Sequence, residues 1–339
     1  MSIQATRLSA IRPAGAPVLS VHELSTVFYG RSGPLTAVDR VSFDVAEGEV
    51  VALVGESGSG KSVTALSIMG LLDSRVASIT GGTIEFDGAD LRAMHEHEFR
   101  RLRGNRIAMV FQEPMTSLNP SLTIGRQLTE GLEVHRGISH HDALRQAEAL
   151  LGSVGISDPA LRLAAYPHEM SGGMRQRVMV AMALSCRPRL LIADEPTTAL
   201  DVTTQAQILD LIKTLTAQSG TAVVLITHDL GLVARYAKRV NVMYSGRLVE
   251  QAGVQRLFAQ PQHPYTRGLL ASMPRLDLPR QDSLMAIEGL PPDLEERDAG
   301  CAFRTRCPVA AARCSEPQPW VDIVPGHRAA CWRAAGSAV

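Results

Sequence analysis

Short apolar runs, each followed by a polar or glycine-rich segment, recur along this chain and predict the strands of an α/β sheet. Several of them are followed by stretches with helical spacing, such as the one that carries Ile208, Leu211 and Leu215. Near the N-terminus, apolar and polar positions alternate instead, which predicts the strands of an antiparallel layer at 18–22 and 41–45. The strongest apolar runs cover residues 50–54, 107–111, 190–193 and 222–226.

Strand patterns are missing between residues 113 and 170, where the chain predicts a helical subdomain with a helix at 140–154. A hairpin around Ser245 and Gly246 closes the sheet pattern. Beyond it, the sequence becomes rich in proline and short of long periodic helices. We therefore expect a flexible N-terminal tail at 1–16, a large α/β domain at 17–257 and a C-terminal extension at 258–339.

Composition excludes several classes of protein. The formal net charge is zero, and only three of the 34 basic residues are lysine, so we expect no general attraction to nucleic acid. The longest apolar runs stop well short of the roughly 18 residues that a membrane-spanning helix needs. A role at a membrane would therefore require docking onto a partner that spans it.

The segment 55–62, Gly-Glu-Ser-Gly-Ser-Gly-Lys-Ser, fits the phosphate-loop pattern G-x-x-x-x-G-K-[ST] without a mismatch. It lies between a predicted strand at 50–54 and a predicted helix at 63–72, which is the context that gives the pattern meaning. Lys61 is expected to bridge the β- and γ-phosphates of a nucleotide, and Ser62 to offer a hydroxyl to Mg²⁺. The loop residues expected to bind nucleotide are Gly55, Ser57, Gly58, Gly60, Lys61 and Ser62.

Polar residues follow three other predicted strands, at the edge of the sheet where ligands bind in open α/β folds. Asp194 is placed to support Mg²⁺, and the adjacent Glu195 to activate water as a general base. Gln112 can reach the metal or the attacking water, although a solvated loop glutamine is the alternative. His228 can donate a hydrogen bond to the γ-phosphate.

Two helix starts and one aromatic pair complete the candidate site. Ser171, with Gly172 and Gly173, can begin a helix as a second anion site, or simply cap it, and Asp201 can cap the next helix. Phe28 and Tyr29 are predicted to lie in a Gly-rich turn region between the first two strands. Either can stack on an adenine ring there; a partly buried aromatic at a turn is the alternative.

The phosphate loop, Gln112, the Ser-Gly-Gly segment, Asp194-Glu195, Asp201 and His228 occur in the order seen in ATP-binding subunits of ABC transporters, which residues 18–257 resemble. The resemblance implies a phosphate-loop core with an antiparallel β layer and a helical subdomain. It also implies a head-to-tail dimer around two ATP molecules. Ser171 and Gly173 would bind the ATP of the opposite subunit, Asp201 would cross the interface, and Gln112 and His228 would sense the γ-phosphate. Met170 and Met174 replace the Leu and Gln that end the general L-S-G-G-Q signature.

Three strings are similar to the dipeptide/oligopeptide importer branch of that family: M-S-G-G-M-R-Q-R-V-M, F-Q-E-P-M-T-S-L-N-P and H-P-Y-T-R-G-L-L. The branch implies an ATPase at the cytoplasmic face of the cell membrane that drives peptide import. Its implied partners are a second, related ATPase chain, two transmembrane permease subunits and an external peptide-binding protein. In this branch Phe28 matches the adenine-stacking aromatic best. Import of nickel or another small solute, and a soluble ABC-type ATPase acting on nucleic acid or ribosomes, are the alternatives.

Four of the five cysteines lie in the C-terminal extension: Cys301, Cys307, Cys314 and Cys331. Four thiolates can hold a [4Fe–4S] cluster, and the lack of C-x-x-C pairs argues against an ordinary zinc ribbon. The resemblance also implies an iron–sulfur cluster; zinc and free thiols are the alternatives. Cys186, outside this group, is predicted to be a small buried apolar residue.

Overall fold

The computed structural model describes residues 15–31, 33–113, 117–197, 201–273, 287–294 and 299–334. Most of the expected N-terminal tail, and Ala199 and Leu200, therefore lie outside the described residues. The chain divides into two compact units that each gather distant segments. The first unit contains 1–19, 44–50 and 85–226, and the second contains 20–43, 51–84 and 227–339. The boundaries expected at residues 17, 113, 170 and 257 stay predictions.

The first unit is built on three parallel strands in the order β8-β7-β6. Their side chains are almost entirely buried, as expected for strands covered on both faces. The register pairs Ile107 with Leu190 and Leu190 with Ala222, so the strand ends lie level. The strands are β6 (Ile107–Val110), β7 (Leu190–Asp194) and β8 (Ala222–Thr227).

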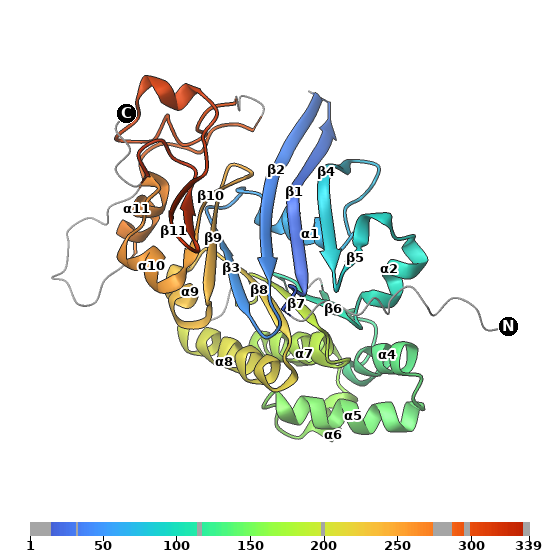
Figure 1. Ribbon diagram of the computed structural model, residues 1–339. Helices are drawn as coiled ribbons and strands as arrows, with labels where there is room; N and C mark the ends of the chain where they lie inside the picture. Colours follow the sequence, from blue (N-terminus) through green and yellow to red (C-terminus); the bar gives the residue numbers. More distant parts are fainter. Residues whose placement is uncertain are drawn as a thin grey trace. The chain divides into compact units, whose positions relative to one another are not determined.

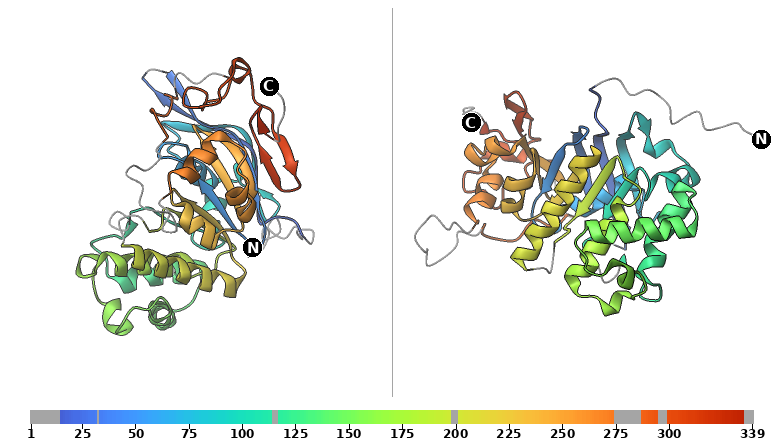
Figure 2. Two further views of the ribbon diagram at one scale, coloured as in Figure 1. Left: turned by 90° about the vertical axis from the view of Figure 1, so that its left-hand side faces the viewer. Right: turned by 90° about the horizontal axis from the view of Figure 1, so that it is seen from below.

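Helices form most of the rest of this unit and confirm the predicted helical part. The helices α4, α5 and α6 contact one another, and α4 and α5 also contact α7. Figure 2 shows α4, α5 and α6 side by side in green. Cys186 lies in a small core with Leu132 and Ala143, which confirms its predicted burial. The elements are η1 (Leu91–Ala93), α2 (Glu96–Leu102), α4 (Ile124–Arg136), α5 (His140–Ser153), α6 (Pro159–Leu163), η2 (Pro167–Glu169), α7 (Gly172–Leu184) and α8 (Val202–Ser219).

The second unit holds two strand layers (Figure 1). The antiparallel layer has the order β2-β1-β4-β5. Most of it belongs to the second unit, whereas the last two residues of β4 and all of β5 belong to the first. The other layer has the order β11-β12-β10-β9-β3. Its strands are β3 (Val50–Val54), β9 (Arg239–Tyr244), β10 (Arg247–Gly253), β11 (Val321–Val324) and β12 (His327–Ala329). The antiparallel layer consists of β1 (Leu19–Gly30), β2 (Gly33–Val45), β4 (Ala77–Phe86) and β5 (Ala89–Asp90).

Short helices complete the second unit. Helix α1 begins at Lys61, two residues before the predicted start, and ends at Ile68 rather than Leu72. The predicted hairpin is confirmed: β9 and β10 pair around Ser245 and Gly246, which both have positive φ angles. The helices are α1 (Lys61–Ile68), α9 (Leu230–Tyr236), α10 (Val254–Ala259), α11 (Pro264–Ala271) and η3 (Ala312–Ser315).

The first two strands are much longer than their predicted cores, and the prediction that Phe28 and Tyr29 lie in a turn is wrong, since both belong to β1. Thr26 explains why the pattern failed. This polar side chain is fully buried, which breaks the alternation, and its hydroxyl forms a 2.9 Å hydrogen bond with that of Ser67 on α1. A buried hydroxyl with a partner 41 residues away leaves no local signal.

Candidate nucleotide-binding site

The phosphate loop follows β3 and ends at the N-terminus of α1, as predicted. Two of its glycines are required by the packing of the backbone. A Cβ atom at Gly55 would lie 2.1 Å from the carbonyl oxygen of Met243, and one at Gly60 would lie 2.7 Å from that of Ala37. Gly60 also has a φ of 100°, in the left-handed region that glycine adopts without strain. The loop therefore winds tightly before α1, which places successive N–H groups around one point.

Lys61 lies inside the loop, with only 6% of its side chain area exposed. Its ammonium group donates hydrogen bonds to the carbonyl oxygens of Gly55 and Glu56, both at 2.8 Å, and to Oγ of Ser59 at 3.2 Å. A buried ammonium held by neutral oxygens can exchange them for phosphate oxygens, which are stronger acceptors. Ser62 follows on the exposed side of the first turn, where its hydroxyl can reach a metal ion on a bound nucleotide.

Two acids and one amide meet at the carboxyl end of β7 in the first unit. Asp194 ends the strand and is buried, and Glu195 follows with a φ of 44°, a rare conformation for a residue with a side chain. The N–H of Glu195 donates to the carbonyl of Ile226 at 2.9 Å, which fixes this turn. Nε2 of Gln112 donates to Oε2 of Glu195 at 3.0 Å. The structure therefore brings together a predicted base and a predicted sensor from strands far apart in sequence.

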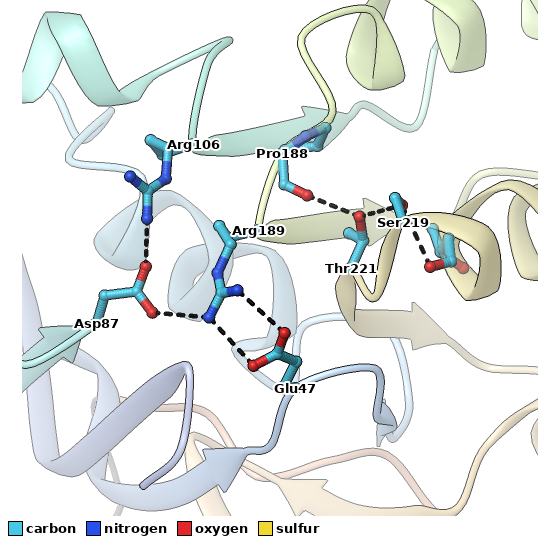
Figure 3. A network of polar contacts seen from close by, with 8 residues as sticks. Glu47, Asp87, Arg106, Pro188, Arg189, Ser219 and Thr221 are labelled. Carbon is cyan, nitrogen blue, oxygen red and sulfur yellow. Dashed lines mark hydrogen bonds and ion pairs between the residues drawn. The ribbon is translucent and has the colours of Figure 1, made fainter. Parts of the chain in front are cut away.

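The start of β7 is fixed by a charged network in the same unit (Figure 3). Arg189 contacts both carboxylate oxygens of Glu47, at 3.0 and 3.3 Å, and one oxygen of Asp87 at 3.4 Å. Arg106 contacts the other oxygen of Asp87 at 2.7 Å. Because Arg189 directly precedes β7, this network holds the amino end of the strand whose carboxyl end carries Asp194 and Glu195.

Ser171 and Asp201 cap helices as predicted. Oγ of Ser171 accepts the N–H of Met174 at the start of α7, and Oδ1 of Asp201 accepts the N–H of Thr204 at 3.0 Å. The side-chain and backbone hydrogen bonds from Thr204 hold the pKa of Asp201 below its usual range, so the cap stays ionised. Both caps are exposed at the surface. Gly173 follows Ser171 in the first turn of α7, where a Cβ would lie 3.3 Å from Cγ2 of Thr204.

Gln176 is a residue that sequence reasoning missed. It lies on α7, is almost fully buried, and its amide donates to the carbonyl of Pro196, the residue after Glu195. It therefore ties the Ser171 helix to the turn that carries the candidate base. A polar residue between two arginines of an exposed-looking segment offers no sequence signal for this burial.

His228 and Phe28 belong to the second unit with the phosphate loop. His228 is exposed directly after β8, and the next residue, Asp229, caps α9 through the N–H of Gly231 at 2.7 Å. Phe28 is half-buried on β1. Tyr29 is 53% exposed, and its hydroxyl forms a 2.9 Å hydrogen bond with Ser78 on β4. That bond fixes the alternative aromatic along the antiparallel layer.

The four cysteines of the extension line one cavity of about 20 Å³. Burial raises the pKa of Cys301 to about 11, so this thiol holds its proton firmly. Three buried N–H groups without partners border the same cavity: Nε2 of His263, Nε2 of Gln318 and Nε1 of Trp332. Within the described part of the chain, no three His, Cys, Asp or Glu side chains are spaced to hold a metal ion. None of the described helices is long and apolar enough to cross a membrane.

Comparison with known proteins places this geometry in a family. Residues 38–198 match the ABC transporter family, and residues 249–314 match the oligopeptide/dipeptide transporter C-terminal region. A probable peptide ABC transporter ATP-binding protein of Sinorhizobium fredii is 54% identical over 95% of this chain and 96% of its own. The oligopeptide transport ATP-binding protein AppD of Bacillus subtilis is 52% identical over 89% of this chain and 92% of its own. The dipeptide transport ATP-binding protein DppD of Escherichia coli is 48% identical over 92% and 94%.

Solved structures agree on the fold. The ATP-binding cassette MJ0796, in a dimeric post-hydrolysis state bound to ADP and Pi, matches with a TM-score of 0.62 and 29% identity over 70% of this chain and 98% of its own. CbiO1 of Clostridium perfringens matches with a TM-score of 0.61 and 27% identity over 72% and 91%. The predicted α/β cassette with an antiparallel layer and helical parts is therefore confirmed. The chain belongs to the ABC transporter family, as an ATP-binding subunit of the dipeptide/oligopeptide importer branch.

Proposed function

We propose that this subunit binds and hydrolyses ATP to power the import of dipeptides or oligopeptides across the cell membrane. The observation that carries the proposal is the phosphate loop with Lys61 inside it, in a chain similar to peptide-transport ATP-binding proteins over about nine tenths of its length or more. We place its action at the cytoplasmic face of the membrane, through permease partners, on the basis of its similarity to peptide-transport ATP-binding proteins.

In this proposal, the two acids at the end of β7 have different roles in ATP hydrolysis. Asp194, Ser62 and Gln112 are the residues that would hold Mg²⁺, and the ion would supply positive charge to the phosphates. Glu195 accepts a proton from the attacking water. Its 3.0 Å hydrogen bond to Gln112 supports this role, because the amide fixes the direction of the carboxylate. His228 donates to the γ-phosphate, and Phe28 stacks on the adenine.

A second ATPase subunit completes each site in this proposal. Ser171, Gly173 and Asp201 would act on the nucleotide held by the opposite subunit. Ser171 and Asp201 are exposed at helix starts, where backbone N–H groups and the helix dipole favour anions, and this supports the role. The related cassette MJ0796 has been solved as a dimer.

The test is to reconstitute the chain in lipid vesicles together with the two permease subunits and the second ATPase of its transporter. We expect ATP hydrolysis that an external binding protein loaded with peptide stimulates. The Lys61→Ala variant should lose ATP binding, whereas Glu195→Gln should bind ATP and not hydrolyse it. Stimulation by a nickel chelate and not by peptide would show that the transported substrate is nickel and not peptide. Co-purification with nucleic acid or ribosomes, without the permeases, would overturn the importer.

We further propose that Cys301, Cys307, Cys314 and Cys331 hold a [4Fe–4S] cluster. The donor set supports it, since four thiols and three unpartnered N–H groups surround one cavity. Sulfur atoms of a bound cluster would accept those N–H groups, which otherwise stay buried at a cost. The cavity holds about one water molecule, so the thiols must move apart to admit a cluster. When bound, the cluster would cross-link an extension with a small core.

The metal content of the chain purified without oxygen tests this proposal. We expect a brown protein with about four irons and four sulfides per chain, absorption in the visible blue region, and loss of all three in Cys331→Ser. Cys186→Ser, whose thiol lies in a separate core, should keep them. One zinc ion per chain would show that the four cysteines bind zinc and not a cluster. Four thiols that all react with a thiol reagent would show that the cysteines are free.

A further inference from the structure

One residue of the phosphate loop, Glu56, is held by the C-terminal extension. Its N–H donates a 2.9 Å hydrogen bond to the hydroxyl oxygen of Tyr265, 209 positions along the chain. Its carboxylate forms a 2.8 Å ion pair with Nη1 of Arg306, 250 positions along. All three residues belong to the second unit. Nucleotide recognition by the loop pattern does not explain either contact, because both lie on the side chain and amide of a variable position.

The two groups that hold Glu56 are themselves fixed. Arg306 is 6% exposed at its side chain, and it also donates to the hydroxyl of Tyr244 and to the carbonyl oxygens of Ile287 and Glu288, at 3.0–3.2 Å. The ring of Tyr265 is fully buried and packs 4.5 Å from that of Tyr244 and 5.4 Å from that of Phe303, measured between centroids. Because the guanidinium already has these partners, its side chain loses little conformational entropy when it pairs with a carboxylate.

Glu56 also contacts the lysine that grips the nucleotide. Its carbonyl oxygen accepts a 2.8 Å hydrogen bond from Nζ of Lys61. The same residue is therefore held at its N–H by Tyr265, at its carboxylate by Arg306 and at its carbonyl by Lys61. A rotation of this part of the loop would change where the ammonium and the neighbouring N–H groups point.

We infer that Arg306 and Tyr265 are positioning residues for ATP binding, through which the C-terminal extension sets the conformation of the phosphate loop. Neither residue has to touch the nucleotide. Arg306 fixes the Glu56 side chain, and Tyr265 fixes the amide that precedes it, so the loop is preorganised for the phosphates. The inference rests on ATP being the ligand of this loop, as proposed above.

The test measures nucleotide affinity in the full chain with a fluorescent ATP analogue, and steady-state hydrolysis in the transporter assembled with the second ATPase and the permeases. For Arg306→Gln we expect the Kd and the KM for ATP to rise about tenfold, with kcat within about twofold. Arg306→Lys should bind ATP more tightly than Arg306→Gln but less tightly than the wild type, because lysine keeps the charge but lacks the planar guanidinium with its several donors. Tyr265→Phe should raise Kd several-fold while it keeps the ring packing.

Two further variants separate positioning from general stability. In Glu56→Gln combined with Arg306→Gln, the Kd should be close to that of either single variant, since both remove the same ion pair. Arg247→Gln is the matched control: Arg247 joins the C-terminal extension to β2 through a 2.7 Å ion pair with Asp39 and a hydrogen bond to Gly300. It should lower the unfolding free energy and leave Kd unchanged.

The outcomes are distinct. A wild-type chain that fails to bind ATP would remove the proposed function itself. A wild-type chain that binds ATP, with Arg306→Gln and Tyr265→Phe folded and equal to it in Kd, would overturn the inference alone. Additive effects of Glu56→Gln and Arg306→Gln would overturn it as well. If Arg306→Gln does not fold, Tyr265→Phe and Glu56→Gln decide by the same measurement.

Discussion

Replacing Gly60 by alanine should damage the phosphate loop far more than replacing Gly58, although both glycines lie in the same turn. The two positions share the left-handed backbone, with φ of 100° at Gly60 and 76° at Gly58. They differ in the space available to a side chain. A Cβ at Gly60 would lie 2.7 Å from the carbonyl oxygen of Ala37, whereas one at Gly58 meets no atom within 4 Å.

The expected loss of free energy has two contributions, the strain of the left-handed backbone and the close contact of the new Cβ. A non-glycine residue in the left-handed region costs about 1–2 kcal/mol, and both variants bear this cost. Gly60→Ala must also move a backbone carbonyl of β2, which cannot rotate away as a side chain can, at about 1–3 kcal/mol more. We therefore expect Gly58→Ala to lose about 1–2 kcal/mol and Gly60→Ala about 2–5 kcal/mol, shared between folding and ATP binding.

Urea unfolding measures the loss of folding free energy, and titration with a fluorescent ATP analogue measures the loss of binding free energy. Where the loss appears in binding, a difference of 1.4 kcal/mol is a tenfold change in Kd. The sum of the two losses should be larger in Gly60→Ala by at least about 1 kcal/mol. Equal sums for the two variants would refute the argument from close packing, and would leave backbone strain as the whole explanation.

The remaining predictions concern the first unit. Glu195→Gln should slow hydrolysis by about 10²–10⁴ with ATP affinity preserved, and near-normal turnover would remove Glu195 from the role of base. Ser171→Ala should lose about 1 kcal/mol in thermal unfolding and also lose ATPase activity in the assembled transporter; Ser139→Ala, which removes the matching cap of α5, should lose only the stability. Arg189→Met should lose about 1 kcal/mol in urea unfolding, less at high salt, and a loss independent of salt would contradict an electrostatic origin.

Features that depend on local chemistry could be predicted from the sequence. The phosphate loop, the caps at Ser171 and Asp201, and the hairpin at Ser245 and Gly246 each follow from a few adjacent residues and their backbone preferences. The meeting of Gln112 with Glu195 followed from a general rule of parallel sheets.

Features that depend on a distant partner could not be predicted. The full length of β1 was hidden because the buried Thr26 is satisfied by Ser67 on another element. The burial of Gln176 depends on a carbonyl 20 residues away. The contacts of Tyr265 and Arg306 with Glu56 join segments more than 200 positions apart, and no periodicity links them. In each case tertiary packing supplies the partner, and the sequence near the residue carries no trace of it.

The pairing of β12 with β10 has a consequence for any shortened version of this protein. Glu250 on β10 is fully buried, and its carboxylate accepts hydrogen bonds from the N–H groups of Gln262 and His263 and contacts Nε2 of His327. Cutting the chain after α10 would strip this acid of all three and leave β10 with a bare edge open to other molecules. A minimal cassette made by truncation should therefore precipitate unless Glu250 is replaced by a neutral residue and the edge is blocked.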